Sequence, residues 1–244
     1  MVPVDILQWF EKDPARFKTE REALVARYPD LSLEDCAKGY RLGPDSFLPF
    51  RAAVIEGICP IDHSGVHTTA AYDIAVVVPS SFPDRVPLLY CRDRKFVRDI
   101  DRHILSDGQA CLCVRSEFRR FLGLDYRLVD FMDKLVHPFL VGQYHYELNG
   151  RWPWKDRSHG VQGIIEAYQE LTGLNSLQAI IGFAEILARK SPAKGHWICP
   201  CGSGRRLRFC HLERYLRLRE SIDYEDAASD LAGLREWRRH EQGR

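Results

Sequence analysis

The sequence predicts an α+β fold in which an antiparallel β-meander is flanked by helices and followed by a helical extension and a small C-terminal zinc knuckle. Three observations support this fold class. Extended segments rich in β-branched residues follow one another with connections too short for crossover helices. Helical periodicity dominates after residue 127. Three cysteines and one histidine then cluster between residues 199 and 211.

The first half of the chain predicts one helix and three strands. Asp13 is a favourable N-cap and Pro14 a favourable first helical residue, and Pro29 ends the helical pattern. The inward face of this helix would carry Phe17, Leu24, Val25 and Tyr28. Residues 47–57, 67–78 and 85–91 are predicted to be the strands of the meander.

The second half predicts helices. Residues 127–148 have helical periodicity, and Pro138 is expected to kink or interrupt that helix. A second helix covers residues 161–171 and ends at Gly173, and a third begins after an Asn175 cap. These elements predict a first domain over 1–150, a helical extension over 151–190, a linker at 191–195, and a module over 196–244 with the zinc knuckle and a trailing helix.

Composition places the chain among ordinary globular proteins. Its 244 residues are 45% hydrophobic with a formal net charge of +1, and no apolar run approaches the roughly 20 residues that span a bilayer. The N-terminus shows no basic leader with an apolar segment, so we expect a cytoplasmic protein with no membrane partner. In that compartment eight cysteines favour thiols used for metal binding or chemistry over disulfides.

The cluster in the last third has the composition of a closed zinc site. Cys199, Cys201, Cys210 and His211 supply a Cys₃His donor set, which zinc binds tetrahedrally, and Gly202 and Gly204 allow a tight turn between the ligands. Four protein ligands leave no open position, so the predicted Zn²⁺ is structural. The six arginines between residues 199 and 219 are followed by a run of acidic residues, so we expect no nucleic-acid partner.

The segment before Cys111 carries a second pattern. Phe82-Pro83 and Pro87 precede a predicted strand, and His103 is followed by Asp107-Gly108-Gln-Ala-Cys111-Leu112. In this order, over roughly residues 14–150, the chain resembles ubiquitin-conjugating enzymes, which place Tyr/Phe-Pro-x-x-x-Pro before a strand and His-Pro-Asn before Asn/Asp-Gly-x-x-Cys-Leu. The resemblance implies the ubiquitin-conjugating fold and a cysteine that carries an acyl group as a thioester.

Carried over by position, the resemblance implies that Cys111 is the thioester cysteine, that His103 braces the loop and that Asp107 forms the turn that presents the thiol. The family's asparagine falls at Leu105, and the His-to-Cys interval is shorter than usual. Thioester formation depends on an exposed, partly ionised thiol, for which the sequence neighbours Arg102 and Arg115 are favourable, whereas transfer to lysine depends on that asparagine.

Other interpretations of Cys111 remain open. Most free cysteines are small buried hydrophobes, and packing is the interpretation we give to Cys36, Cys59, Cys91 and Cys113. A Cys-His hydrolase would use Cys111 as nucleophile and His103, His137 or His159 as base. A conjugating fold without activity would serve as a scaffold for a protein partner. Conventional ligation of a ubiquitin-like protein to lysine is a further alternative.

Residues 197–212 resemble the SEC-C motif, a zinc knuckle named for the carboxy-terminal tail of a secretion ATPase, which implies docking to a protein. The sequence contains no P-loop and no GxGxxG after a strand, so the acyl group is expected to be activated elsewhere. The combined architecture is similar to conjugating enzymes of short anti-phage CBASS operons. That resemblance implies a cGAS-like nucleotidyltransferase, or else a ubiquitin-like protein, as partner.

Overall fold

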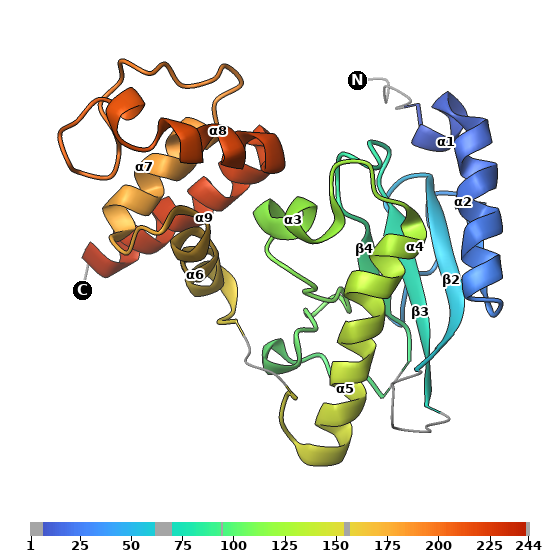
Figure 1. Cartoon of the computed structure of the whole chain (residues 1–244). Coiled ribbons are helices and arrows are strands. Elements are labelled where there is room, and N and C mark those ends of the chain that lie inside the picture. Colours follow the sequence, from blue (N-terminus) through green and yellow to red (C-terminus); the bar gives the residue numbers. More distant parts are fainter. Residues whose placement is uncertain (1–6, 62–69, 94, 154–156, 243–244) are drawn as a thin grey trace. The chain divides into compact units, whose positions relative to one another are not determined.

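The computed structural model describes residues 7–61, 70–93, 95–153 and 157–242, and the chain folds into two compact units (Figure 1). The first unit comprises Met1–Leu112 and Leu124–Lys155. The second comprises Cys113–Gly123 and Asp156–Arg244. The chain therefore leaves the first unit directly after Leu112, contributes a short segment to the second, and returns.

The first unit is built on a four-stranded antiparallel sheet, which confirms the predicted α+β class and the predicted meander. Its strands are β1 (Leu31–Cys36), β2 (Ala52–Pro60), β3 (Ala71–Val78) and β4 (Leu88–Cys91), in the spatial order β1-β2-β3-β4. Because side chains alternate along a strand, Val54 and Val77, which pair across β2 and β3, point to one face with Cys36. That face is covered by the loop carrying Leu42 and Leu48.

The strand prediction was wrong in two places. β1 was not predicted, although its leucines Leu31 and Leu33 are buried and alternate with half-exposed residues; Glu34 and Asp35 lower the strand propensity of this short segment. The segment before β2 was predicted to be extended because it is aromatic, yet Phe47 and Phe50 are more than half exposed in a loop. Of the predicted strand 67–78, residues 67–69 lie outside the described residues.

Helix α2 (Pro14–Arg27) follows the short α1 (Trp9–Lys12) and packs against β1 and α4 (Leu128–Phe131). The predicted cap is confirmed, since the Asp13 carboxylate accepts a hydrogen bond from the Arg16 N–H at 2.9 Å. On its buried face, Glu20 accepts a hydrogen bond from the Leu128 N–H at 2.8 Å. The carboxylate thereby caps the N-terminus of α4 and ties two helices that are far apart in sequence.

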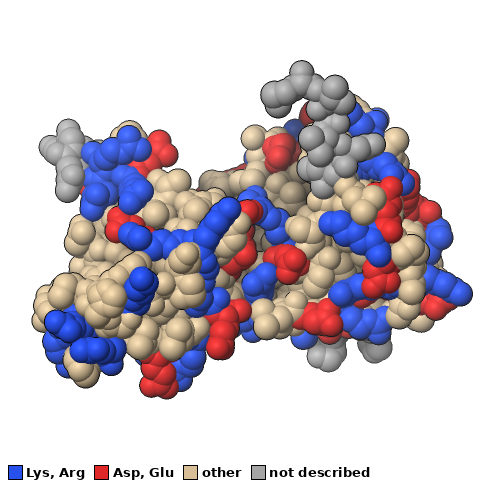
Figure 2. Space-filling view, turned by 90° about the horizontal axis from the view of Figure 1, so that it is seen from above, with Lys and Arg blue, Asp and Glu red and all other residues tan. Residues whose placement is uncertain are grey.

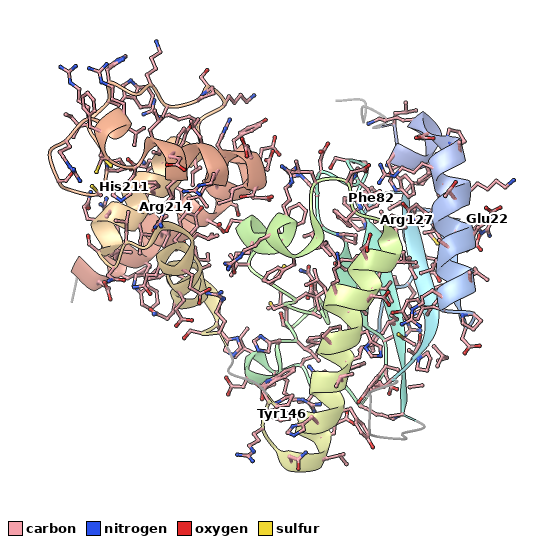
Figure 3. All side chains as sticks on the ribbon, viewed as in Figure 1. Glu22, Phe82, Arg127, Tyr146, His211 and Arg214 are labelled. Atoms are coloured by element: carbon pink, nitrogen blue, oxygen red, sulfur yellow. The ribbon has the colours of Figure 1, made fainter. Side chains whose placement is uncertain are left out.

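The predicted interruption near Pro138 is present. A π-helical turn over Met132–Val136 separates α4 from α5 (His137–Asn149), with the proline in the first turn of α5. Proline has no backbone N–H to donate within a continuous α-helix. The π turn before Pro138 shifts the hydrogen-bond pattern by one residue, so that the His137 N–H donates to the Met132 carbonyl. α5 ends at Gly150 in the left-handed region and carries Tyr146 near its C-terminal end (Figure 3).

The Phe-Pro segment before β4 is anchored by aromatic packing. Phe82 is buried, its ring lies 5.0 Å from Trp9 and 5.3 Å from Tyr126 between centroids, and the Arg16 guanidinium covers it at 5.0 Å. The Tyr126 hydroxyl donates to the Arg85 carbonyl at 3.0 Å, which fixes the following residues. The Phe82–Pro83 peptide bond is cis.

The second unit is helical. It contains α6 (Gly160–Thr172), α7 (Leu177–Leu187), α8 (Leu212–Ser221) and α9 (Tyr224–Gln242), together with the short helices η2 (Arg115–Glu117), α3 (Phe118–Leu122) and η4 (Leu207–Phe209). Two details differ from the prediction. The cap of α7 is Ser176, whose side chain accepts from the Ala179 N–H, and not Asn175. The trailing helix is two helices, broken at Ile222, which is extended and buried.

The structure divides the chain differently from the sequence. The expected linker at 191–195 lies inside the second unit, where Ala193 is buried and its N–H donates to the Tyr215 hydroxyl at 2.7 Å. One hydrophobic core joins α6 and α7 to Cys199, Leu207 and the last two helices. The helical extension and the Cys/His module are therefore one folding unit. Among the described residues, no helix has the length and apolar composition needed to cross a membrane.

A buried polar cluster joins η2, α6 and α9 in this unit. Ser116, Tyr168 and Asp230 are each at most 5% exposed. Burial raises the pKa of Asp230 to about 6, and the charge of Asp226 raises that pKa further. The hydroxyl groups of Ser116 and Tyr168 lower the pKa of the Asp230 carboxyl by hydrogen bonding. At neutral pH the folded protein therefore holds a carboxylate that would be better solvated in the unfolded chain.

We expect Asp230→Asn to stabilise the protein at pH 7.5. Because the folded-state pKa of about 6 exceeds the model-peptide value of 3.8, wild-type stability falls as pH rises between these two values. The variant should gain about 2–3 kcal/mol at pH 7.5 and almost nothing near pH 4, measured by thermal unfolding across that range. Glu236→Gln, at an exposed site on the same helix, is the matched control. A gain that does not change with pH would contradict this account.

Candidate functional site

The residues before Cys111 form a hairpin that lies against the edge strand β4. Ile104 pairs with Ala110 across the hairpin, and Gln109 pairs with Tyr90 of β4. The Cys91 N–H donates to the Gly108 carbonyl at 3.0 Å, and the Ala110 N–H donates to the Leu89 carbonyl at 2.8 Å. The hairpin thus extends the sheet and carries the chain directly to Cys111.

The turn of this hairpin is closed by Leu105 through Gly108. The Gly108 N–H donates to the Leu105 carbonyl at 2.9 Å, and the Leu105 N–H donates to the Gln109 carbonyl at 2.8 Å. Gly108 has φ +85°, a left-handed conformation that disfavours residues with a Cβ. The Asp107 carboxylate accepts the Gln109 N–H at 3.0 Å, and the Asp107 carbonyl accepts the Ser46 hydroxyl. The structure therefore places Asp107 in the turn, as a residue that shapes it.

Cys111 is half-buried and is held through its backbone. Its N–H donates to the His103 carbonyl at 2.8 Å. His103 follows the short helix η1 (Ile100–Arg102) and adopts a left-handed conformation with φ +54°. Its ring packs edge-on against Trp152 with centroids 5.0 Å apart, and the Trp152 indole N–H donates to the Asp101 carbonyl at 2.9 Å. His103 thus contacts Cys111 with its carbonyl while its ring packs on Trp152.

The charge of Arg102 is directed at helix α5. The Arg102 guanidinium donates to Gln143 Oε1 at 2.9 and 3.2 Å, stacks on Tyr146 at 5.1 Å and lies 3.6 Å from a Glu147 carboxylate oxygen. The Gln143 side-chain amide donates back to the Arg102 carbonyl at 2.5 Å. Both side chains are buried, so this bracket fixes the entry to the His103–Cys111 segment. The sequence suggested that Arg102 would lie beside the Cys111 thiol because the two residues are close in the chain. In the structure the contacts of its guanidinium given above are with residues of α5.

The histidines considered as hydrolase bases lie on different elements. His103 is in the hairpin segment, His137 begins α5, and His159 is the N-cap residue of α6 in the second unit. Cys36, Cys59 and Cys91 are buried, and burial raises the pKa of each thiol, that of Cys36 to about 11 and that of Cys59 to about 12. These raised pKa values fit the packing role that the sequence indicated for them.

The Cys/His cluster, Cys199, Cys201, Cys210 and His211, comes together in the second unit with all four donor atoms within 4.8 Å of one another. Sγ of Cys201 and Cys210 are 3.5 Å apart, and His211 Nδ1 lies 3.3 Å from Cys199 Sγ and 3.1 Å from Cys210 Sγ. Donors around a tetrahedral zinc ion would be about 3.5–3.8 Å apart, given Zn–S and Zn–N bonds of about 2.3 and 2.0–2.1 Å. The donor set and its spacing fit a metal ion bound by these four residues.

The backbone around the cluster is a small hairpin packed on α7. The Cys199 N–H donates to the Arg205 carbonyl at 2.8 Å, and the Leu207 N–H donates to the Trp197 carbonyl at 2.7 Å. A Cβ at Gly182 of α7 would come within 2.6 Å of the Pro200 side chain, so glycine permits this close approach. Ser203 Oγ lies 3.2 Å from Cys201 Sγ and 3.4 Å from Cys210 Sγ. The loop that carries the Cys/His cluster is therefore part of the core of the unit.

Several arginines of the basic segment have structural partners. Arg214 donates to the Thr172 carbonyl at the end of α6, and Arg219 donates to the Leu187 and Lys190 carbonyls at 2.5 and 2.8 Å at the end of α7. Cations at helix C-termini satisfy unpaired carbonyls and the helix dipole. Figure 2 shows Lys and Arg interspersed with Asp and Glu on the face in view. Both arginines therefore have their hydrogen-bond partners within the second unit. Figure 3 labels Arg214 and His211 in this unit.

The sequence and the fold were compared with known families, curated proteins and solved structures. No family model and no curated protein matches the sequence. Among solved structures, the crystal structure of the yeast vps23 UEV domain in complex with a vps27 PSDP peptide aligns with a TM-score of 0.40 and 15% sequence identity. The alignment covers 64% of this chain and 90% of that domain.

Proposed function

We propose that this protein is a ubiquitin-conjugating-like transferase that forms a thioester between Cys111 and the C-terminus of a protein partner. The observation that carries the proposal is the half-buried Cys111, held by the His103 carbonyl at the end of a hairpin that extends an antiparallel four-stranded sheet. A nucleophile at the end of a rigid hairpin is positioned with little conformational freedom. The order of sheet, hairpin and cysteine is the order on which the family resemblance rests.

The reaction is an acyl transfer from an activated carboxyl group. The Cys111 thiolate attacks the carbonyl carbon of a C-terminal acyl adenylate made by a separate adenylating enzyme; the C–S bond forms, the C–O bond to phosphate breaks, and AMP leaves with the electron pair. The thiol proton passes to solvent. In this proposal His103 positions the cysteine backbone and Asp107 shapes the turn.

We propose a cGAS-like nucleotidyltransferase as the partner and anti-phage defence as the context, with the thioester regulating the nucleotidyltransferase. The support is the resemblance of the combined architecture to conjugating enzymes of short CBASS operons. The Cys/His cluster, which we propose binds structural zinc, holds an exposed arginine-bearing loop that includes Arg205, Arg206 and Arg208. In the SEC-C family such a loop docks onto proteins, and we propose the same use in this chain.

Intact mass spectrometry of the co-expressed pair tests the proposal. Wild-type protein should carry an adduct with the mass of the partner minus water, released by hydroxylamine or excess thiol. Cys111→Ala should lose at least about 95% of this adduct, because no other atom replaces the sulfur nucleophile. Cys113→Ala, two residues away and also half-buried, is the matched control and should keep the adduct. A thiol-sensitive adduct that persists in Cys111→Ala would sink the assignment.

One observation favours a scaffold as the second candidate function. Leu105 occupies the position of the family's asparagine, and both its N–H and its carbonyl are used in the turn, so this position offers no amide to an attacking lysine. If Cys111→Ala keeps full biological activity while truncation of residues 196–244 abolishes it, the scaffold interpretation holds. Ligation of a ubiquitin-like protein to lysine would instead appear as an adduct that resists hydroxylamine.

A further inference from the structure

His103 has a backbone conformation that residues with a Cβ disfavour. Its φ of +54° lies in the left-handed region, and within the described residues no other non-glycine residue has a positive φ. Such a conformation costs free energy and persists only where surrounding contacts hold it. The His103 carbonyl also accepts the Cys111 N–H at 2.8 Å. The contacts that hold His103 therefore also set the position of the Cys111 backbone.

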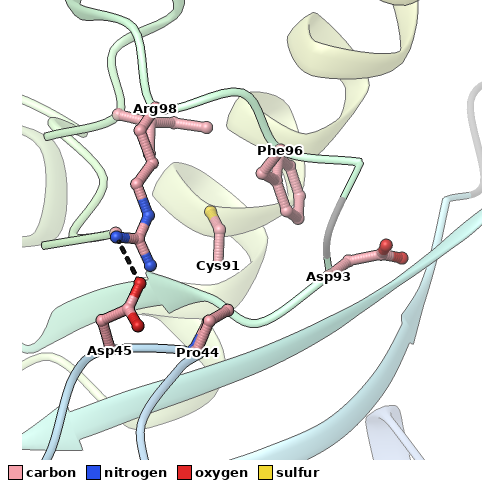
Figure 4. A pocket seen from close by; sticks show the side chains of 8 residues that line it. Pro44, Asp45, Cys91, Asp93, Phe96 and Arg98 are labelled. Carbon is pink, nitrogen blue, oxygen red and sulfur yellow. Dashed lines mark ion pairs between the residues drawn. The ribbon is translucent and has the colours of Figure 1, made fainter. Parts of the chain in front are cut away.

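Backbone hydrogen bonds and one ion pair fix the turn that leads into this left-handed residue. The Asp99 carbonyl accepts the Arg102 N–H at 3.0 Å and the Ile104 N–H at 3.1 Å. Immediately before this turn, the Arg98 guanidinium lies 2.9 Å from an Asp45 carboxylate oxygen, an ion pair that Figure 4 shows in close view. These contacts determine where the turn begins and ends.

Trp152 contacts the same turn through its side chain. Its indole N–H donates to the Asp101 carbonyl at 2.9 Å, and its ring packs edge-on against the His103 ring with centroids 5.0 Å apart. The same indole packs against α5, where the ring centroids of Phe139 and Tyr146 are 6.1 and 6.0 Å away. One side chain therefore joins helix α5 to the residue that holds the Cys111 N–H.

We propose that Trp152 is a positioning residue for the reaction at Cys111. The indole keeps His103 in its left-handed conformation, and the histidine carbonyl then holds the cysteine backbone. The inference rests on the proposed thioester function and adds a residue that this function requires. Trp152 follows α5 on the stretch that leads into the second unit, so no sequence pattern near Cys111 indicates it.

Amide hydrogen exchange at two neighbouring residues of the full-length, zinc-loaded protein tests this role. The Cys111 N–H is bonded to the His103 carbonyl, whereas the Ala110 N–H is bonded to the Leu89 carbonyl of β4 at 2.8 Å. Trp152→Leu removes both the indole donor and the aromatic ring. We expect its Cys111 amide to exchange at least about tenfold faster and its Ala110 amide to stay within about twofold of wild type. A general loss of stability would speed both amides, so the ratio of the two rates isolates the effect on His103.

Further variants separate the ring from the indole N–H. Trp152→Phe keeps a ring against His103, so its Cys111 amide should exchange more slowly than that of Trp152→Leu. Glycine adopts the left-handed conformation without support. Adding Trp152→Leu to His103→Gly should therefore speed the Cys111 amide by no more than about twofold. Trp237→Leu, at an exposed tryptophan of α9, is the matched control and should leave both amides unchanged. Thermal unfolding establishes that each variant is folded.

Formation of the adduct in the co-expressed pair links this contact to the reaction. Shortly after induction, Trp152→Leu should carry roughly tenfold less of the thiol-sensitive adduct than wild type, because a displaced nucleophile reacts more slowly. Trp237→Leu should carry as much as wild type. Intact mass spectrometry measures both yields, with Cys111→Ala defining the background.

Failure of the inference and failure of the proposed function give different results. If wild-type protein forms no adduct, the proposed chemistry fails, and the ratio of the two amide rates still decides whether Trp152 positions Cys111. An unchanged ratio in Trp152→Leu would overturn the inference. A full yield of adduct in that variant would overturn it as well, because Trp152 would then hold the backbone without serving the reaction.

Discussion

Removing the zinc that we propose for the Cys/His cluster is expected to unfold the second unit while the first unit keeps its sheet. Structural zinc supplies about 10–16 kcal/mol of apparent binding free energy at neutral pH, which equals or exceeds the entire stability of a typical domain. The loop that carries the Cys/His cluster is part of the core of this unit, because Cys199 and Leu207 are buried with residues of α6 to α9. Loss of the metal would remove the link that joins three cysteines and an imidazole within this core.

Hydrogen exchange after treatment with a strong chelator is the most informative measurement. Protection should be lost across α6 to α9 and retained in β2 and β3. Residues 113–123 distinguish the two units most clearly, because they belong to the second unit although they begin two residues after Cys111. Their protection should fall with α9 and not stay with the sheet.

Cys210→Ser should reproduce the effect of the chelator, because it removes one of four ligands. Cys113→Ser makes the same chemical change at a half-buried cysteine outside the cluster and should retain one equivalent of zinc. A chelated protein whose α6 to α9 remain as protected as before would contradict a structural role for the metal. Loss of the sheet together with these helices would contradict the division into two units.

Local chemistry explains why much of the first unit could be predicted. The antiparallel meander follows from short connections between β-branched segments, and α2 follows from the Asp13-Pro14 start. The strand that was not predicted, β1, has buried Leu31 and Leu33 at alternate positions. It is also short and contains two acidic residues, whose low β-strand propensity weakened the strand signal of that alternation. The proximity of Cys199, Cys201, Cys210 and His211 was predictable because their spacing in the sequence is local.

Long-range contacts explain what could not be predicted. Nothing local indicates that residues 113–123 fold with the second unit; that follows from buried Ser116 near Tyr168 and Asp230, and from Glu117 pairing with Arg157 at 3.2 Å. The linker at 191–195 was inferred from Ser, Pro and Gly, residues that favour loops, but a loop can still be buried in a core. The composition of residues 191–195 indicates a turn, but it does not indicate that Ala193 within this turn is buried.

The bracket between Arg102 and Gln143 gives the second large expected effect. Arg102→Met keeps the length of the side chain and leaves the fully buried Gln143 Oε1 without its charged donor. A hydrogen bond to a charged group contributes about 1.5–3 kcal/mol, so the variant should lose about 2–3 kcal/mol of unfolding free energy in urea. Gln143→Leu should lose more, about 3–5 kcal/mol, because the buried guanidinium then keeps the Tyr146 ring and Glu147 at 3.6 Å but loses its hydrogen-bond acceptor.

The double variant Arg102→Met/Gln143→Leu separates a specific bond from simple packing. Because both polar partners are then replaced by apolar groups, its loss should be smaller than the sum of the single losses by about 1–3 kcal/mol. Arg102→Lys, which keeps the positive charge but not the paired donation to Gln143 Oε1, is the control for charge alone. Additive losses would mean that the two side chains act independently.

The same variants connect this bracket to the chemistry at Cys111. Arg102 is followed by His103, whose carbonyl holds the Cys111 N–H at 2.8 Å, so loosening Arg102 should loosen the nucleophile. We expect the Cys111 amide to exchange at least about tenfold faster in Arg102→Met, since a loss of about 1.4 kcal/mol in local stability changes an opening constant tenfold. The rate in the double variant should be no slower than in Arg102→Met, because the double variant also lacks the hydrogen bond from the Gln143 amide to the Arg102 carbonyl. An unchanged amide in a destabilised protein would show that the bracket supports the fold without positioning the cysteine.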